Sequence, residues 1–200
     1  MLYAATRWGE HGATFADGRR NLYASAVLVD DYKLDPNGTL DDGRPLLVAL
    51  WDKGPLRDYN LSALNFSGNL NFNVLVNGEP LIFDTPNTLY GELDFRTLFW
   101  YIRKNFWEVT NNMDANPIHI AANAFKLPDV MPGFNIPKEH INAPDKFGNT
   151  YLHYAYHGPY ADVNVPWLLK QGANPNIPNN FGDVPANMIY KKLTTLGQGE

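Results

Sequence analysis

The stretch at residues 147–156 reads FGNTYLHYAY, and it places a histidine, a threonine, an asparagine and three tyrosines within ten residues. Such a group of hydrogen-bonding and titratable side chains is typical of a catalytic site. It is equally typical of a turn followed by a capped helix, because Gly148 suits a tight turn and Thr150 suits the residue before a helix. A catalytic site occurs once in a chain, whereas a structural unit can recur.

The stretch does recur along the chain. Related segments read DDGRPLLVAL (41–50), VNGEPLIFDT (76–85), MDANPIHIAA (113–122) and FGDVPANMIY (181–190). One column of their alignment contains Pro45, Pro80, Pro117, Tyr151 and Pro185, at intervals of 35, 37, 34 and 34 residues, and Met1 extends it to the N-terminus. A period near 34 with turn residues and a proline before an apolar run predicts stacked turn–helix–helix units. We expect one domain over residues 1–200.

The repeated unit resembles the ankyrin repeat, whose pattern runs D-x-x-G-x-T-P-L-H-x-A and then L-L-x-x-G-A-D-x-N. The resemblance is carried by GNTYLHYA (148–155), LLKQGANPN (168–176) and NNFGDVP (179–185). It is strongest in residues 113–192, and residues 86–112 depart from it most. It implies an all-α solenoid of about six repeats, the first incomplete, in which pairs of helices are joined by hairpin-like loops.

Individual residues follow from this scheme. The column prolines are expected at the first position of each first helix, where a missing N–H costs nothing. The next residue of each unit is apolar and expected in the core: Leu46, Leu81, Ile118 and Leu152. A second helix carrying the apolar stripe 167–169 is expected to begin at Pro166, with Gly172 as its left-handed C-cap. Three prolines within residues 127–142 predict a short or broken helix there.

The histidines favour a structural role. His119 and His153 occupy one repeat column, and the resemblance implies that each links adjacent hairpins through hydrogen bonds. Residues one repeat apart lie roughly 10 Å apart, which is too far to share a metal ion with bonds near 2.0–2.1 Å. The chain has no cysteine and no phosphate-loop or nucleophile-elbow motif. We therefore expect no catalytic residue, no metal site and no cofactor.

Composition narrows the classes of partner. A net charge of −5 and a pI near 5.5 argue against nucleic acid. No apolar run approaches the roughly 20 residues that cross a bilayer, and the N-terminus MLYAATRWGE has no signal-peptide pattern. The chain is expected to be cytoplasmic or otherwise intracellular, with delivery into a host cell by a signal-independent route as the alternative. Self-association through the N-terminal end is a further alternative, because an array needs a polar terminal cap.

The resemblance implies a non-catalytic module that binds another protein through hairpin tips and first helices. The tip position lies four residues before the column, and the helix position lies six residues after it. The predicted partner-binding residues at these positions are Trp51, Val76, Met113, Asn123, Phe147, His157 and Phe181. The tip residues of four of the five units are apolar, which is typical of an interaction surface. Stacking of these residues along the hairpins is the alternative.

A second class of function stays open at this point. Residues 86–112 contain the aromatic block FWYIRKNFW (99–107), which suits either an exposed anchor or the core. Helical spacing places Leu98, Tyr101, Ile102 and Phe106 on one face and favours the core. An enzyme or an enzyme inhibitor, such as a toxin-neutralising protein, would have its site in this region. The family includes host regulators and bacterial effectors, so the resemblance names no partner.

Overall fold

The computed structural model describes residues 35, 37–41, 43, 45, 47–48, 71, 74–87, 91–102 and 106–188. The chain divides into two compact units, Met1–Val76 and Asn77–Glu200. In the first unit, Thr39 and Pro45 form an isolated antiparallel bridge, and the amide of Asn71 donates to Asn37 Oδ1 at 2.6 Å. Trp51 lies outside the described residues, as does residue 46.

Short strands and paired helices make up the described chain from residue 75 onward. Strand β1 (Leu75–Val76) ends the first unit and strand β2 (Glu79–Pro80) begins the second, with a turn between them in which Asn77 and Gly78 both have positive φ. The helices are η2 (Leu81–Asn87), α5 (Gly91–Ile102), η3 (Phe106–Glu108), α6 (Pro117–Ala124), α7 (Leu127–Val130), α8 (Tyr151–His157) and α9 (Ala161–Lys170). Residues 185–188 are helical as well. The expected all-α repeat solenoid is confirmed.

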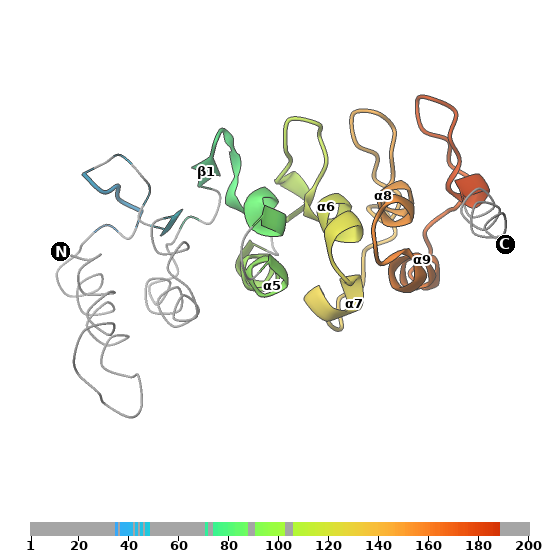
Figure 1. Ribbon diagram of the computed structural model, residues 1–200, viewed down its shortest axis with the longest axis horizontal. Coiled ribbons are helices and arrows are strands. Elements are labelled where there is room, and N and C mark those ends of the chain that lie inside the picture. Colours follow the sequence, from blue (N-terminus) through green and yellow to red (C-terminus); the bar gives the residue numbers. More distant parts are fainter. Residues whose placement is uncertain are drawn as a thin grey trace, which may run out of the picture. The chain divides into compact units, whose positions relative to one another are not determined.

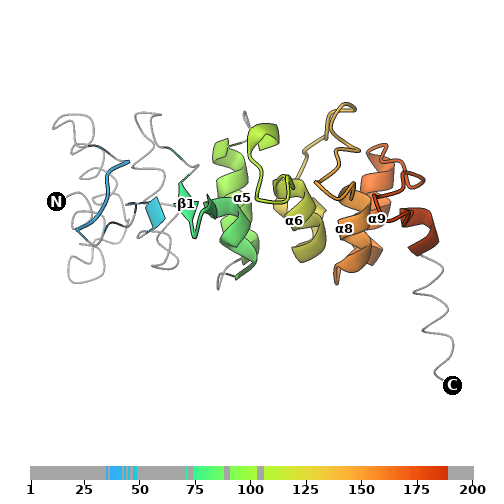
Figure 2. The ribbon, with the colours of Figure 1, turned by 90° about the horizontal axis from the view of Figure 1, so that it is seen from above.

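The second unit has two rows of helices beneath a row of loops (Figure 1). Helices η2, α6 and α8 form the inner row, next to the loops, and η2 contacts α6 as α6 contacts α8. Helices α5, α7 and α9 form the outer row, and each pairs with an inner helix of its own repeat. The view from above shows the pairs following one another along this unit in chain order (Figure 2). Each repeat therefore contacts mainly its neighbours.

The inner helices begin where the sequence predicts. Asn116 is the N-cap of α6, its Oδ1 accepts from the amide of Ile118 at 3.0 Å, and Pro117 follows at the first helical position. Thr150 is the N-cap residue of α8. Ile118 and Leu152, the residues that follow the column, are fully buried, as expected for the core. The short α7 confirms that the prolines of residues 127–142 limit the helix there.

The first helix of the repeat at residues 80–87 differs from expectation. Pro80 belongs to β2, and the helix that follows is a 3-10 helix with Pro86 inside it. In an α-helix, the residue at position 86 would donate to the carbonyl of Ile82, and proline has no N–H to do so. Thr85 Oγ1 donates to that carbonyl instead, at 2.8 Å. The threonine side chain therefore replaces the hydrogen bond that proline removes.

The expectation that the helix carrying residues 167–169 begins at Pro166 was wrong. Helix α9 begins at Ala161 and carries Pro166 within it, on the exposed side. Leu168 is fully buried, but Leu169 is 40% exposed, so the buried stripe runs through Asn164, Val165 and Leu168. The helix ends as predicted, with Gly172 at a φ of 99° directly after the cap residue.

Candidate partner-binding surface

Each hairpin of the second unit is built around one buried or half-buried side-chain oxygen. Asn111, Asp145 and Asn179 occupy the same column, 34 residues apart. In each case the side chain accepts hydrogen bonds from the amides two and four residues further on, at 2.8–3.1 Å. These bonds fix the turn and hold the intervening residue at its tip. The sequence interpretation missed this column, although the recurrence of Asn or Asp at a 34-residue interval could have revealed it.

Main-chain hydrogen bonds join one hairpin to the next. The amide of Lys146 donates to the carbonyl of Met113 at 2.8 Å, and the amide of Asn180 donates to the carbonyl of Phe147 at 2.9 Å. The Asn180 side chain adds a bond to the carbonyl of Lys146 at 3.2 Å. Successive hairpins are therefore held together near their tips by hydrogen bonds to main-chain carbonyls.

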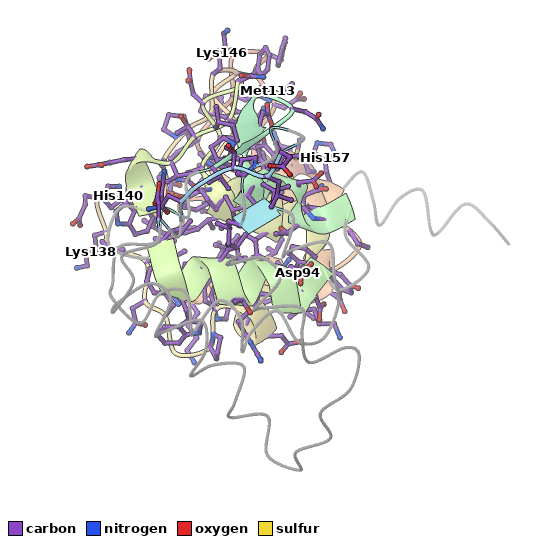
Figure 3. All side chains as sticks on the ribbon, turned by 90° about the vertical axis from the view of Figure 1, so that its left-hand side faces the viewer. Asp94, Met113, Lys138, His140, Lys146 and His157 are labelled. Carbon is purple, nitrogen blue, oxygen red and sulfur yellow. The ribbon has the colours of Figure 1, made fainter. Side chains whose placement is uncertain are left out.

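Three apolar side chains stand at these tips and form a surface that we name the tip ridge: Met113, Phe147 and Phe181. Their side chains are 50%, 37% and 73% exposed, respectively. The rings of Phe147 and Phe181 stack with centroids 6.2 Å apart and planes inclined by 27°. The rings thus stack along the hairpins and also remain open to solvent. Figure 3 places Met113 at the tip end of the unit, beside Lys146.

The other predicted partner-binding residues lie in different settings. His157 is exposed at the end of α8, and Figure 3 places it on the side of the unit opposite His140. Asn123 on α6 is half-buried, and its Nδ2 donates to the carbonyl of Tyr154 at 3.4 Å. In the first unit, Val76 is half-buried in β1, whereas the neighbouring Leu75 is 56% exposed.

The two column histidines are structural links, as the resemblance implied. The amides of Asn116 and Thr150 donate to Nδ1 of His119 and His153, respectively, so each Nε2 carries the proton. His119 Nε2 donates to the carbonyl of Ala143 and His153 Nε2 to that of Asp183, both at 3.0 Å. Each imidazole therefore joins a helix cap to the following hairpin.

Burial controls the ionisation of two of these groups. The loss of water around His119 lowers its pKa to about 4, although the carbonyl of Ala143 and the charge of Asp145 oppose that shift. Burial alone would raise the pKa of Asp145, but hydrogen bonds from Asn149 and Tyr154 outweigh it and hold the pKa below its ordinary value. At neutral pH His119 is therefore neutral and Asp145 is an anion.

The described side chains of the aromatic block at residues 99–107 divide between the core and the surface. Leu98 and Ile102 are buried, as predicted, and so is Phe99, whose ring meets Phe134 edge-on with centroids 4.9 Å apart. Trp100 is 48% exposed on the outer row. Trp107 is half-buried and stacks on His140 at 4.1 Å, with planes inclined by 7°. The side chains of Tyr101 and Phe106 are outside the described set, as is Lys104.

The described ranges contain neither a cluster of metal-ligating side chains nor a membrane-spanning helix. Within them, no group of three or more His, Asp or Glu side chains is arranged to hold a metal ion. No helix that the structure describes combines the length and the apolar character needed to span a membrane. The described residues do bring together the exposed apolar side chains of the tip ridge, on hairpins that are hydrogen-bonded to one another.

Comparison with known proteins identifies the repeat. Over 91 residues the chain is 36% identical to the ankyrin repeat protein L271 of Acanthamoeba polyphaga mimivirus, a match that covers 42% of this chain and 12% of that protein. The chain thus spans a small part of the length of this curated relative. No protein-family model matches the chain.

Solved structures share the fold. EF0377, an ankyrin repeat protein, aligns with a TM-score of 0.62 and 20% identity over 90% of each chain. A chain from the complex of the predatory endopeptidase Bd0816 of Bdellovibrio bacteriovorus with immunity protein Bd3460 aligns with a TM-score of 0.58 and 18% identity. That alignment covers 100% of this chain and 97% of the other. The fold is therefore that of stacked ankyrin repeats.

Proposed function

Because this chain has the fold of stacked ankyrin repeats, we propose that it binds a partner protein through the tip ridge and the neighbouring first helices, without catalysis or a cofactor. Ankyrin repeat proteins generally mediate protein–protein interaction. The observation that carries the proposal is the exposure of Met113, Phe147 and Phe181 at successive tips that main-chain hydrogen bonds join to one another. Exposed apolar side chains contribute favourable binding free energy when a partner removes them from water.

The full proposed surface comprises the residues predicted from the sequence. Met113, Phe147 and Phe181 provide the apolar anchors, and His157 provides an exposed polar contact on α8. Trp51, Val76 and Asn123 stay within the proposal as the corresponding positions of other repeats. A regulator or a bacterial effector would both use such a surface, and an intracellular location remains part of the same proposal.

The test is a triple substitution of the tip ridge, Met113→Ser, Phe147→Ser and Phe181→Ser. We expect the variant to keep its fold, because the side chains are exposed, and to lose at least about thirtyfold in affinity for a partner that co-purifies with the wild-type chain. Leu169→Ser is the matched control, since Leu169 is an exposed leucine on α9, away from the tips. A large fall in the melting temperature of the triple variant, with binding retained by its folded fraction, would instead assign the ridge to hairpin packing.

One observation favours a narrower candidate, an enzyme inhibitor. The fold neighbour from Bdellovibrio bacteriovorus comes from a complex of an endopeptidase with an immunity protein. A protruding apolar ridge suits insertion into the cleft of an enzyme, and the tip ridge is a better site for this than residues 86–112, where Phe95, Leu98 and Phe99 are buried. If the co-purifying partner is an enzyme, the same triple variant should fail to inhibit it, while the Leu169→Ser variant should inhibit normally.

A further inference from the structure

Lys146 places a positive charge beside the centre of the tip ridge. It is exposed, it directly precedes Phe147, and Figure 3 shows it at the tip end of the unit. Within the described part of the chain its ammonium group makes no ion pair. It lies in a chain with a net charge of −5, in which carboxylates outnumber basic side chains.

The nearest carboxylate in the sequence, Asp145, makes no ion pair with that ammonium group. Asp145 is only 6% exposed, and its two oxygens accept four hydrogen bonds. These come from the amides of Phe147 and Asn149 at 2.8 Å, from Asn149 Nδ2 at 3.1 Å and from Tyr154 Oη at 2.8 Å. The carboxylate is thus committed to the hairpin, and the Lys146 ammonium stays available to a partner.

The main-chain groups of Lys146 and Phe147 at this hairpin tip are hydrogen-bonded within the fold. The amide and carbonyl of Lys146 pair with Met113 and with the Asn180 side chain. The amide and carbonyl of Phe147 pair with Asp145 and with the amide of Asn180. Because these main-chain groups are already bonded, the exposed side chains of Lys146 and Phe147 provide the contacts at this tip that are open to a partner.

The charges along the ridge form a pattern. The central hairpin carries the free Lys146, whereas the hairpins on either side carry exposed carboxylates, Asp114 after Met113 and Asp183 after Phe181. Charge complementarity at an interface selects among partners more than it adds affinity. A carboxylate would be attracted at the centre of this ridge and repelled at its flanks.

From this pattern we infer that the partner presents a carboxylate directly beside an apolar or aromatic side chain. The apolar group packs on the Phe147–Phe181 ring pair, and the carboxylate pairs with Lys146. The inference rests on the proposed function, because it assigns a chemistry to a segment bound on the same tip ridge. The occupant of the tip ridge is therefore a protein segment that combines acidic and apolar residues.

The experiment is selection from a random-peptide phage library on the immobilised chain of residues 1–200. Peptides recovered on the wild-type chain should combine Asp or Glu with an adjacent aromatic or aliphatic residue. The charge-reversal variant Lys146→Glu should recover peptides without that acidic residue and should bind a wild-type-selected peptide roughly tenfold more weakly at low ionic strength. Lys146→Arg should bind that peptide normally. Lys138→Glu is the matched control, because Lys138 is an exposed lysine that Figure 3 places away from the tips.

The outcomes separate this inference from the proposed function. Recovery of the same peptides by the wild-type chain and by Lys146→Glu would overturn the inference, and so would wild-type peptides that lack an excess of acidic residues or a library that yields no binder. Peptides that still bind the triple serine variant would overturn the proposed function instead. If the triple variant loses binding but the Lys146→Glu variant selects the same peptides as the wild-type chain, the tip ridge remains the binding site. Only the inference that the partner presents a carboxylate would then be rejected.

Discussion

His119 combines three contacts that together fix its protonation. Its Nδ1 accepts from the amide of Asn116 at 3.1 Å, which leaves the proton on Nε2, and Nε2 donates to the carbonyl of Ala143 at 3.0 Å. The ring also meets the ring of Tyr151 edge-on with centroids 4.5 Å apart. A proton added to Nδ1 would break the helix-cap bond and place a charge in a residue that is only 1% exposed. The same geometry that links the repeats therefore resists protonation.

Acid should consequently destabilise the fold through His119. The pKa of His119 is lowered from 6.5 to about 4 in the folded chain, so between these values the unfolded chain binds more protons than the folded chain. The free energy of unfolding then rises with pH, and about 3 kcal/mol of stability is lost as the pH falls from 7 to 4. Chemical denaturation at several pH values should give a shallower dependence for His119→Gln. A histidine-selective NMR titration that finds the proton of His119 on Nδ1 would contradict the assignment.

At the scale of the hairpins, glycines of one repeat column experience different neighbours. Gly148 and Gly182 have nearly equal φ values of 79° and 82°. A Cβ on Gly148 would lie 2.7 Å from Asn180 Oδ1 and 3.0 Å from the Asn180 amide nitrogen, whereas a Cβ on Gly182 would meet no atom within 4 Å. Both positions therefore require a left-handed backbone conformation, but only a side chain at residue 148 would also collide with the next hairpin.

Alanine substitution at these glycines should measure that contact. We expect Gly182→Ala to cost about 1–2 kcal/mol, because the left-handed conformation alone disfavours a side chain. Gly148→Ala should cost about 1–3 kcal/mol more, since the Cβ also pushes into the following hairpin. Urea denaturation of the two variants gives the difference directly. Equal losses would mean that the hairpins separate freely at this point.

Part of each element could be predicted from local sequence alone. The turn glycine, the cap residue and the proline at the helix start act within a few residues of one another, so the beginnings of α6 and α8 follow from the chain. The beginning of α9 does not, because a helix with Pro166 inside it is stabilised by packing of Val165 and Leu168 rather than by local preference. The 3-10 helix η2 likewise contains a bond from the Thr85 hydroxyl to the carbonyl of Ile82, which no repeat pattern encodes.

At the scale of the whole second unit, the candidate surface was predictable only in part. The repeat column located Met113, Phe147 and Phe181, because the tip is a fixed position of each repeat. Lys146 was missed, because its importance depends on the use of the Asp145 carboxylate inside the fold. A charge pattern on a surface emerges only when the buried charges are known, and burial here results from contacts between repeats.

At this scale, a loss of stability in one repeat should also weaken the neighbouring repeats. Asn164 on α9 is fully buried, its Nδ2 donates to the carbonyls of Ala122 and Phe125, and its Oδ1 accepts from the amide of Leu127. Asn164→Leu has a similar volume but leaves these three main-chain groups buried without partners, which should cost at least about 3 kcal/mol. In a stack in which each repeat contacts its neighbours, the loss should be largest in the two repeats that Asn164 joins.

Hydrogen exchange followed by mass spectrometry can map that loss. Peptides covering α6, α7 and α9 should exchange much faster in Asn164→Leu than in the wild-type chain, and peptides covering α5 should change less. Asn187→Leu is the control, because Asn187 is an exposed asparagine in the helical residues 185–188. An equal increase from residue 91 to residue 188 would show that the repeats open as a single cooperative block. A graded increase would show that they open in sequence, so a partner that binds the tip ridge across several hairpins would itself hold the array together.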